Sequence, residues 1–370
     1  MKIAIVHEMF VKFWWAEQVV KNISEIYPEA DIFTLLYDEK KIWKHFPKNK
    51  IHDSCFSLPS QKIYSFTKRP RLSLPWMAQS VETLDLSAYD VVLVSSSWFA
   101  HGVITKPDTQ CIVYYHSPAR YLWDWTNELK KSIHAHKWFK SLLCNSLFLK
   151  LRQWDYMAAQ RVDTRIANSY NVAKRIKKYY RQEAEVLYPP IDTQRFSSDT
   201  HTTWDYYIII SALTEFKNIQ VAITSFNRMP DKKLVIIGAG DYRKSLENIS
   251  ESSNISFTWP QYWDNLVHLV QSSAGLVFPW EEDFGIVPIE VMAAGKPVFA
   301  YRGGGLTETV LEWLTWEFFD NIRGEDFVEK FRIFDTKNIS WAYSSETCVN
   351  QAKIFDKNIF EEGLRKLISK

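Results

Sequence analysis

The chain contains 370 residues, of which 46% are hydrophobic and 24% are charged. This composition is typical of a folded globular protein, and the length exceeds what one hydrophobic core usually fills, so we expect two domains. The formal net charge of +2 gives no strong overall field, which argues against nucleic acid as a partner.

The first half of the chain alternates short apolar runs with segments of helical spacing. Such alternation predicts parallel strands joined by helices. The predicted strands are 3–6, 31–35, 91–94, 111–115 and 165–167, and the predicted helices are 16–26, 145–162 and 169–180. Asn168 and Ser169 are suited to cap the last of these helices.

Two adjacent prolines, Pro189 and Pro190, interrupt this pattern and favour extended backbone. The alternation then restarts, with predicted strands 207–211, 234–237, 255–258, 275–278 and 298–301 and predicted helices 219–228 and 264–272. We therefore predict an α/β protein of two Rossmann-like, doubly wound parallel-sheet domains that face each other across a cleft. The predicted boundaries are 1–188 for the N-terminal domain, 189–350 for the C-terminal domain, and 351–370 for a final helix that packs back toward the N-terminal domain.

The four cysteines lie far apart and form no C-x-x-C pair. This spacing disfavours a zinc site and a disulfide framework. The chain has neither the apolar core of a signal peptide nor an apolar run long enough to span a bilayer. We therefore expect a reduced, cytoplasmic protein.

The segment from Glu281 to Glu290 carries the clearest chemical pattern, E-E-D-F-G-I-V-P-I-E. It follows a predicted strand and leads into a helix that we expect to begin at Pro288 and to end before Gly295. Free amides at the start of such a helix, together with the positive end of its dipole, favour a phosphate group. The segment therefore combines an anion site with two carboxylates, Glu282 and Glu290, that can accept hydroxyl hydrogen bonds.

This segment resembles the E-x7-E motif of the retaining glycosyltransferases of family 4, also called glycosyl transferases group 1, which have the GT-B fold. The resemblance covers nearly the whole chain. It implies a nucleotide-sugar substrate and no metal. It places Glu282 at the transferred sugar and Glu290 at the nucleotide ribose, and it makes the residues between them, Phe284, Gly285, Ile286 and Val287, part of the donor site.

Further matches to the family lie elsewhere in the second half of the chain. They are Lys217, the Gly238-x-Gly240 pair, the Pro-Pro-Ile-Asp run at 189–192, and Gly303-Gly304. The resemblance implies that Lys217 contacts the diphosphate. Ala212 stands where the family usually has a second cation, so Lys217 acts alone or with Arg302.

His116-Ser117-Pro118-Ala119-Arg120 follows the predicted strand at 111–115. A single histidine is more often a structural hydrogen-bonding group, but its place at a strand's carboxyl end favours a functional role. In the family this histidine lies beside the transferred sugar, and Arg120 is placed to steady charge. Retaining transfer then depends mainly on electrostatic stabilisation of the leaving diphosphate.

The chain contains 16 Trp and only 11 Gly, whereas average usage gives roughly 26 Gly in this length. The family's first loop reads Gly-Gly-Ala-Glu, and here it reads Trp14-Trp15-Ala16-Glu17. Further Trp residues stand at positions where similar proteins have Gly, namely Trp259, Trp280, Trp313 and Trp316, with Trp98 and Trp204 as weaker cases. Trp43, Trp123 and Trp154 have the character of genuine aromatic residues.

One cause explains these positions together: a UGA codon that the cell reads as Gly and that the printed sequence renders as Trp. The alternative is a genuinely Trp-rich chain whose obstructed donor loop makes it an inactive sugar-nucleotide-binding protein. At a position that needs Gly, an indole is expected in a strained turn of positive φ. We therefore predict distorted backbone at 14–15 and at 280.

The run Ser117 to Trp123 resembles mannosyltransferases, so GDP-mannose is the first donor to consider, with UDP-sugars as the alternative. The acceptor is a glycan or a lipid-linked sugar. The stretch from Lys130 to Arg152 has six basic residues, no acid and several large apolar side chains, which is compatible with peripheral contact with an anionic membrane or with an ordinary solvated helix. A nucleotide-sugar epimerase on the same fold is a further alternative.

Overall fold

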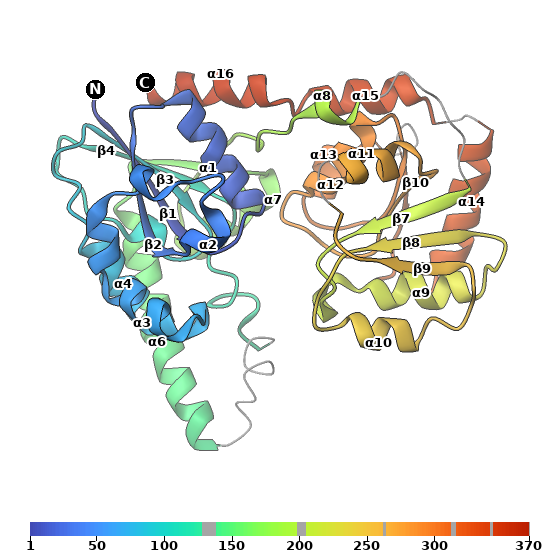
Figure 1. Ribbon diagram of the computed structural model, residues 1–370, viewed down its shortest axis with the longest axis horizontal. Coiled ribbons are helices and arrows are strands. Elements are labelled where there is room, and N and C mark those ends of the chain that lie inside the picture. The colour runs from blue at the N-terminus through green and yellow to red at the C-terminus, as the bar shows by residue number, and fades with distance from the viewer. Residues whose placement is uncertain (128–137, 198–204, 262–263, 312–315, 341–342, 370) are drawn as a thin grey trace. The chain divides into compact units, whose positions relative to one another are not determined.

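The computed structural model describes residues 1–127, 138–197, 205–261, 264–311, 316–340 and 343–369 (Figure 1). The chain divides into two compact units. Unit 1 comprises Met1–Pro189 together with Glu361–Lys370, and unit 2 comprises Pro190–Phe360. Each unit is built around its own six-stranded sheet.

The sheet of unit 1 has the strand order β2-β1-β3-β4-β5-β6, and every neighbouring pair is parallel. The strands are β1 (Ile3–Phe10), β2 (Asp31–Tyr37), β3 (Val91–Ser96), β4 (Gln110–Tyr115), β5 (Thr164–Ala167) and β6 (Glu185–Val186). The α-helices are α1 (Trp15–Ile26), α2 (Glu39–Ile42), α3 (Pro59–Thr67), α4 (Pro70–Glu82), α6 (Trp138–Gln160) and α7 (Tyr170–Tyr180).

The sheet of unit 2 has the order β12-β11-β10-β7-β8-β9, again parallel throughout. Its strands are β7 (Tyr206–Ile210), β8 (Lys233–Ile237), β9 (Ile255–Thr258), β10 (Gly275–Phe278), β11 (Val298–Tyr301) and β12 (Trp316–Phe319). Its helices are α8 (Thr193–Phe196), α9 (Ile219–Asn227), α10 (Arg243–Asn248), α11 (Asp264–Gln271), α12 (Ile286–Ala293), α13 (Leu306–Thr309), α14 (Phe327–Ile339) and α15 (Ser345–Lys353). Figure 1 shows α11, α12 and α13 on one side of β7–β9, and α9 and α10 on the other.

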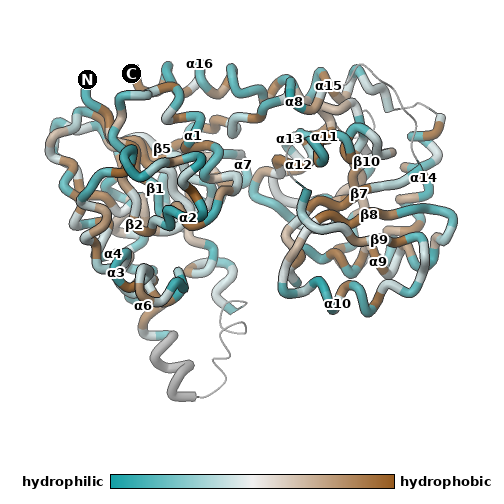
Figure 2. Tube along the Cα trace, in the orientation of Figure 1, coloured by the Kyte–Doolittle hydropathy of each residue, from teal (hydrophilic) through white to brown (hydrophobic). Residues whose placement is uncertain are grey.

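The central strands of both sheets are almost wholly buried, which is why they read as continuous apolar runs. Figure 2 shows the same character in unit 2 as brown segments along β7 and β8. Aromatic rings extend this core: Phe299 packs against Phe319, Phe327, Phe331 and Phe334 with centroid distances of 4.9 to 5.5 Å. Two parallel, doubly wound sheets are the fold class that the alternating pattern predicts.

Several predicted boundaries agree with the structure, and others need correction. Strand β1 continues to Phe10 rather than ending at residue 6, and α6 begins at Trp138 rather than at residue 145. The Ser169 hydroxyl caps α7 by accepting the Val172 amide at 3.1 Å, as predicted. Helix α12, however, begins at Ile286 rather than at Pro288. Proline fits two residues into this helix because the first four amides of a helix have no acceptor within it.

The last part of the chain forms two helices, α15 and α16 (Lys357–Ile368), separated by a short break. The part of α16 from Glu361 onward belongs to unit 1, where the Arg365 guanidinium lies 5.7 Å from the ring centre of Tyr27. Among the described residues, no helix is both long and apolar enough to cross a membrane.

Candidate active site

In unit 2 the strand order reverses between β7 and β10, and ligands of such sheets bind beyond the carboxyl ends of the strands at this point. The chain leaving β7 carries Lys217 in the short 3-10 turn Glu215–Lys217, and the chain leaving β10 carries Glu282. The two side chains form an ion pair, with 24% of the lysine and 33% of the glutamate side chain exposed. A cation and a carboxylate thus meet where a ligand is expected.

Helix α12 begins directly after this loop, at Ile286, with Gly285 as its N-terminal capping residue. Gly285 has φ of 92°, and an added Cβ would lie 2.7 Å from Cδ1 of Leu306, so only glycine fits here without strain. The first residues of the helix, Ile286 and Val287, carry amides that have no acceptor within the helix. The neighbouring Phe284 is buried and packs against Phe355, so its side chain serves the core.

Glu290 lies in the middle of α12 and is 8% exposed. Burial raises the pKa of its carboxyl to about 8, and the charge of Arg195 offsets only part of this shift. A buried carboxyl whose pKa is strongly shifted is a candidate functional residue.

Gly238 and Arg302 lie at the ends of two other strands of the same sheet. A Cβ at Gly238 would lie 1.9 Å from the Ser211 carbonyl oxygen, so the loops after β7 and β8 approach each other more closely than a side chain allows. The Arg302 guanidinium lies 2.5 Å from a carboxylate oxygen of Asp320 and 4.3 Å from the ring of Phe318. Arg302 is therefore paired with Asp320, which is not among the predicted site residues.

In unit 1, His116 follows β4 and is half-buried. Its amide donates to the Ser96 carbonyl at 2.8 Å, its carbonyl accepts from the Asn168 side chain at 3.0 Å, and its Nε2 lies 2.8 Å from the Ser95 hydroxyl. Burial, followed by the charge of His7, lowers the pKa of the His116 ring to about 3. The ring is therefore neutral at physiological pH.

Arg120 lies four residues further along the chain. Its Nε is 3.4 Å from a carboxylate oxygen of Asp124, and its guanidinium lies 3.6 Å from the ring centre of Trp125. These contacts hold the cation close to the segment that carries His116.

The two tryptophans at the start of α1 are exposed, Trp14 by 54% and Trp15 by 44%. Trp14 has φ of −129°, an extended conformation, and the Lys12 ammonium lies 3.2 Å from its ring centre. The predicted distortion at 14–15 is wrong, because extended backbone suits any residue at this cap position. Trp259 is likewise exposed, by 66%.

Trp280 differs from these residues because it is only 2% exposed. Its ring lies 3.9 Å from that of Phe278, its Nε1 donates to Glu282 at 3.0 Å, and the Lys217 ammonium lies 5.0 Å from its ring centre. The indole therefore occupies space directly beside the Lys217–Glu282 pair.

The backbone at Trp280 is not of the strained kind that we predicted. The non-glycine residues of positive φ in the described part of the chain are Lys68, Arg181 and Asn218, with no tryptophan among them. An indole here consequently affects the space around the ion pair rather than the local turn. Trp204 and Trp313 lie outside the described residues.

Polar residues in unit 1 that the sequence patterns did not single out lie next to His116. His7 on β1 and Ser95 on β3 are register partners, and both are buried. A polar residue that follows a buried apolar strand, as His7 follows Ile3–Val6, is the signal that would have identified them. No group of three or more metal-binding side chains occurs within the ranges that the structure describes.

The fold is shared with solved glycosyltransferase structures. Alr3699/HepE of Anabaena in complex with UDP superposes with a TM-score of 0.72 at 15% identity, with 100% of both chains covered. Sucrose-phosphate synthase of Thermosynechococcus elongatus gives a TM-score of 0.71 at 11% identity, covering 100% of this chain and 98% of that one. The two sheets thus define a GT-B fold.

Two family descriptions match consecutive parts of the chain, Glycosyltransferase Family 4 over residues 44–195 and Glycosyl transferases group 1 over residues 190–346. The chain belongs to this glycosyltransferase family. It is 27% identical over 297 residues to the alpha-1,3/1,6-mannosyltransferase ALG2 of Kluyveromyces lactis, with 66% of this chain and 56% of that protein covered. The chain spans about half the length of the curated mannosyltransferases it matches.

Proposed function

We propose that the protein is a retaining glycosyltransferase that transfers a sugar from a nucleotide-diphosphate donor to a glycan or a lipid-linked sugar. The observation that supports this most directly is the ion pair of Lys217 and Glu282 at the strand reversal of unit 2, followed at once by the N-terminus of α12. A diphosphate is the ligand for which a cation and a helix N-terminus are both suited. In this proposal unit 2 binds the donor, and unit 1 provides His116 and contacts the acceptor.

The roles follow from the chemistry of each group. The bond between the sugar's C1 and the diphosphate oxygen breaks, a bond from C1 to the acceptor oxygen forms, and the acceptor proton passes to the leaving diphosphate. Lys217 and the amides of Ile286 and Val287 stabilise the negative charge that develops on that diphosphate. Glu282 accepts hydrogen bonds from the transferred sugar, and Glu290 accepts hydrogen bonds from the ribose.

GDP-mannose is the donor that we propose first, supported by the likeness to the ALG2 mannosyltransferases and by the run Ser117 to Trp123. The solved Alr3699/HepE structures hold UDP, UDP with glucose, and UDP-glucose, which makes UDP-glucose the first alternative donor. Protein made with Gly at residues 14, 15, 259, 280, 313 and 316 should be tested for nucleoside-diphosphate release from GDP-mannose and UDP-glucose, with and without a glycan acceptor. Release from neither donor, with no binding of GDP or UDP by calorimetry, would refute the proposal.

A second function has one observation in its favour. The buried indole of Trp280 contacts Glu282 and lies 5.0 Å from Lys217, the residues assigned to the donor. If Trp280 is the residue in the cell, this crowding supports an inactive member of the family. Binding of a nucleotide sugar without any release of its nucleoside diphosphate would favour that function.

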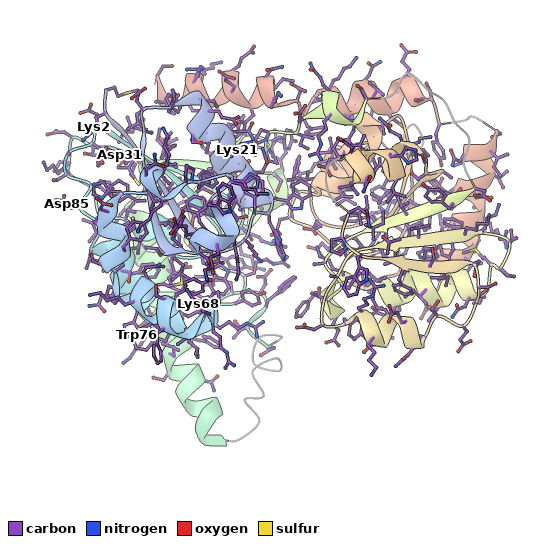
Figure 3. The ribbon with its side chains drawn as sticks, in the orientation of Figure 1. Lys2, Lys21, Asp31, Lys68, Trp76 and Asp85 are labelled. Carbon is purple, nitrogen blue, oxygen red and sulfur yellow. The ribbon has the colours of Figure 1, made fainter. Side chains whose placement is uncertain are left out.

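We also propose that unit 1 contacts an anionic membrane surface, where a lipid-linked acceptor would lie. Part of the basic stretch 130–152 lies outside the described residues, but helices α3 and α4 have the same character. Phe66 is 91% exposed and Trp76 is 40% exposed, and the segment from Cys55 to Val81 contains four basic residues and no acid. Lys68 and Trp76 both lie in this region of unit 1 (Figure 3).

Vesicles test this contact. Co-sedimentation with vesicles of anionic lipid should be strong at low salt and fade as salt rises, because each basic residue near such a surface contributes about 1 kcal/mol. The double substitution Phe66→Ser and Trp76→Ser should weaken it by removing apolar insertion. Exposed Ile339 of unit 2 offers a control, as Ile339→Ser. Equal sedimentation of both variants, or no binding at low salt, would refute the contact.

A further inference from the structure

A continuous line of polar side chains runs through unit 1 from the start of α1 to the end of β4. The Glu17 carboxylate lies 3.7 Å from Nε2 of His7, and Nδ1 of His7 lies 3.1 Å from the Ser95 hydroxyl. The same hydroxyl lies 2.8 Å from Nε2 of His116. Glu17, His7 and Ser95 are all at least 95% buried, so water does not replace these contacts.

The sheet topology explains why these residues meet. Strands β1, β3 and β4 are consecutive neighbours, and the order of unit 1 reverses between β1 and β3. His7 and Ser95 are paired in register on the first two strands, and His116 is the first residue after the third. The carboxyl ends of these strands therefore bring the three side chains to one edge of the sheet.

Glu17 has a second contact that links this line to the loop before α1. Its other carboxylate oxygen accepts the backbone amide of Trp14 at 2.8 Å, as the third residue of a helix often does for the capping residue. One buried carboxylate therefore fixes both the loop at residues 14–15 and the ring of His7.

The acceptors and charges around these side chains determine which ring nitrogens of His7 and His116 carry protons. Burial lowers the pKa of His7, but the Glu17 carboxylate at 3.7 Å, the charge of Glu8 and the Ser95 carbonyl together outweigh burial and raise it. Nδ1 of His7 also lies 3.3 Å from the Ser95 backbone carbonyl, which can only accept, so Nδ1 carries a hydrogen and faces the Ser95 hydroxyl as a donor. The Ser95 hydroxyl hydrogen then points to Nε2 of His116. Because His116 is neutral, its single ring proton lies on Nδ1.

We propose that Glu17, His7 and Ser95 are positioning residues that act through His116. They hold its Nε2 as an acceptor from Ser95, so that its Nδ1–H is the group that donates to an oxygen of the sugar substrate. This inference rests on the proposed function, because it assumes that His116 contacts the sugar. It makes His116 a hydrogen-bond donor during transfer and not a base.

Nitrogen-15 NMR of the ligand-free protein tests, without any substrate, which nitrogen of the His116 ring carries the proton. The two neutral forms of a histidine ring have different nitrogen shifts, and His116→Gln identifies the signals of that ring. We expect a protonated Nδ1 and an unprotonated Nε2 in the unmodified protein. Ser95→Ala should move the ring toward the form protonated on Nε2, and Ser95→Thr, which keeps the hydroxyl, should restore the original signals.

Kinetics separates positioning from a general loss of structure. Ser95→Ala should lower kcat about tenfold with little change in donor KM, since it removes one hydrogen bond that orients His116. Ser96→Ala is the matched control, because that neighbouring buried hydroxyl donates to Glu8 and not to the His116 ring. We expect its His116 signals to be unchanged and its kcat to stay within about twofold.

The outcomes distinguish this inference from the function on which it rests. Unchanged His116 signals in Ser95→Ala, or a ring protonated on Nε2 in the unmodified protein, would overturn the inference even if the enzyme transfers sugar. Absence of turnover with every sugar nucleotide would overturn the proposed function, while the NMR result would still report on the contact between Ser95 and His116. Equal kinetic losses in Ser95→Ala and Ser96→Ala would reduce Ser95 to a structural role.

Discussion

The candidate residues of the two units lie on sheets of the same parallel, doubly wound type, but they differ in charge and in exposure to water. In unit 1, His116 is neutral and is held by buried hydrogen bonds through Ser95. In unit 2, Lys217 and Glu282 are a partly exposed ion pair beside a helix N-terminus. Charged groups near water attract a diphosphate, whereas a neutral, half-buried donor held by the buried Ser95 hydroxyl is suited to a sugar hydroxyl. Under the proposed function, this difference would place affinity for the donor in unit 2 and orientation of the sugar in unit 1.

The largest expected effect concerns the space beside the ion pair in unit 2. If UGA was translated as Trp, the gene carries UGA at the six positions assigned to Gly and UGG at the aromatic positions. The first set is Trp14, Trp15, Trp259, Trp280, Trp313 and Trp316, and the second is Trp43, Trp123 and Trp154. Protein with Gly at the six positions should bind nucleoside diphosphate that the printed sequence does not bind, which calorimetry would measure.

Stability provides an independent reading of the same question. Trp280 is buried, so Trp280→Gly should lower the free energy of unfolding by about 3–5 kcal/mol if the tryptophan is genuine. Trp123, which we expect to be a genuine tryptophan, is the residue to compare with Trp280, because its indole N–H donates to the buried carboxylate of Asp155 at 2.7 Å. UGG at all six positions, with a stability loss in Trp280→Gly and no gain in nucleotide binding, would contradict the reassignment.

The second effect tests whether charge in unit 2 determines donor use. Lys217→Met should lower kcat/KM by about 100- to 1,000-fold, because one group that stabilises the leaving diphosphate is lost. Glu282→Ala should act mainly on kcat. Lys232→Met is a matched control, since Lys232 is 20% exposed and pairs with Asp335 away from the site residues. An equal loss in Lys217→Met and Lys232→Met would indicate damaged folding, and full activity in both site variants would refute the assignment.

The sequence was sufficient for features that depend on local order and insufficient for those that depend on packing. The alternating apolar runs predict both parallel sheets, and Ser169 and the loop after β10 are recognisable from their neighbours in sequence. The link from His7 to His116 requires the register of three strands that are far apart in the chain. No local pattern specifies that register.

The tryptophans are a second example of what sequence patterns cannot predict. Their number and positions are visible in the sequence, but the prediction of strained turns assumed that glycine is needed there for positive φ. Trp14 has an extended backbone, and Trp280 crowds its neighbours instead of straining its own turn. Whether a position needs glycine for conformation or for space is decided by the surrounding atoms, which only the fold supplies.

The smallest expected effect is the pH dependence of stability and of donor binding, because Glu290 is a buried acid in the unit that we assign to the donor. Its folded-state pKa is raised from 4.5 to about 8, so the folded protein retains a proton that the unfolded chain releases between these values. This contribution to stability is complete below pH 4.5 and is lost as the pH rises toward 8, by up to about 1.4 kcal/mol per pH unit. Glu290→Gln should remove that slope from thermal unfolding measured between pH 6 and 8. The pKa of Asp155 in unit 1 is also raised by burial, to about 7, so the difference between the two proteins, and not either curve alone, isolates Glu290.

Donor binding should depend on the same carboxyl, because a ribose hydroxyl donates to its carboxylate form. Donor affinity should therefore increase with pH up to about 8 in the unmodified protein and stay flat in Glu290→Gln, with KM raised by the equivalent of about 1–3 kcal/mol. Equal pH dependence of donor binding in the two proteins would remove Glu290 from the donor site and leave it a residue of the core.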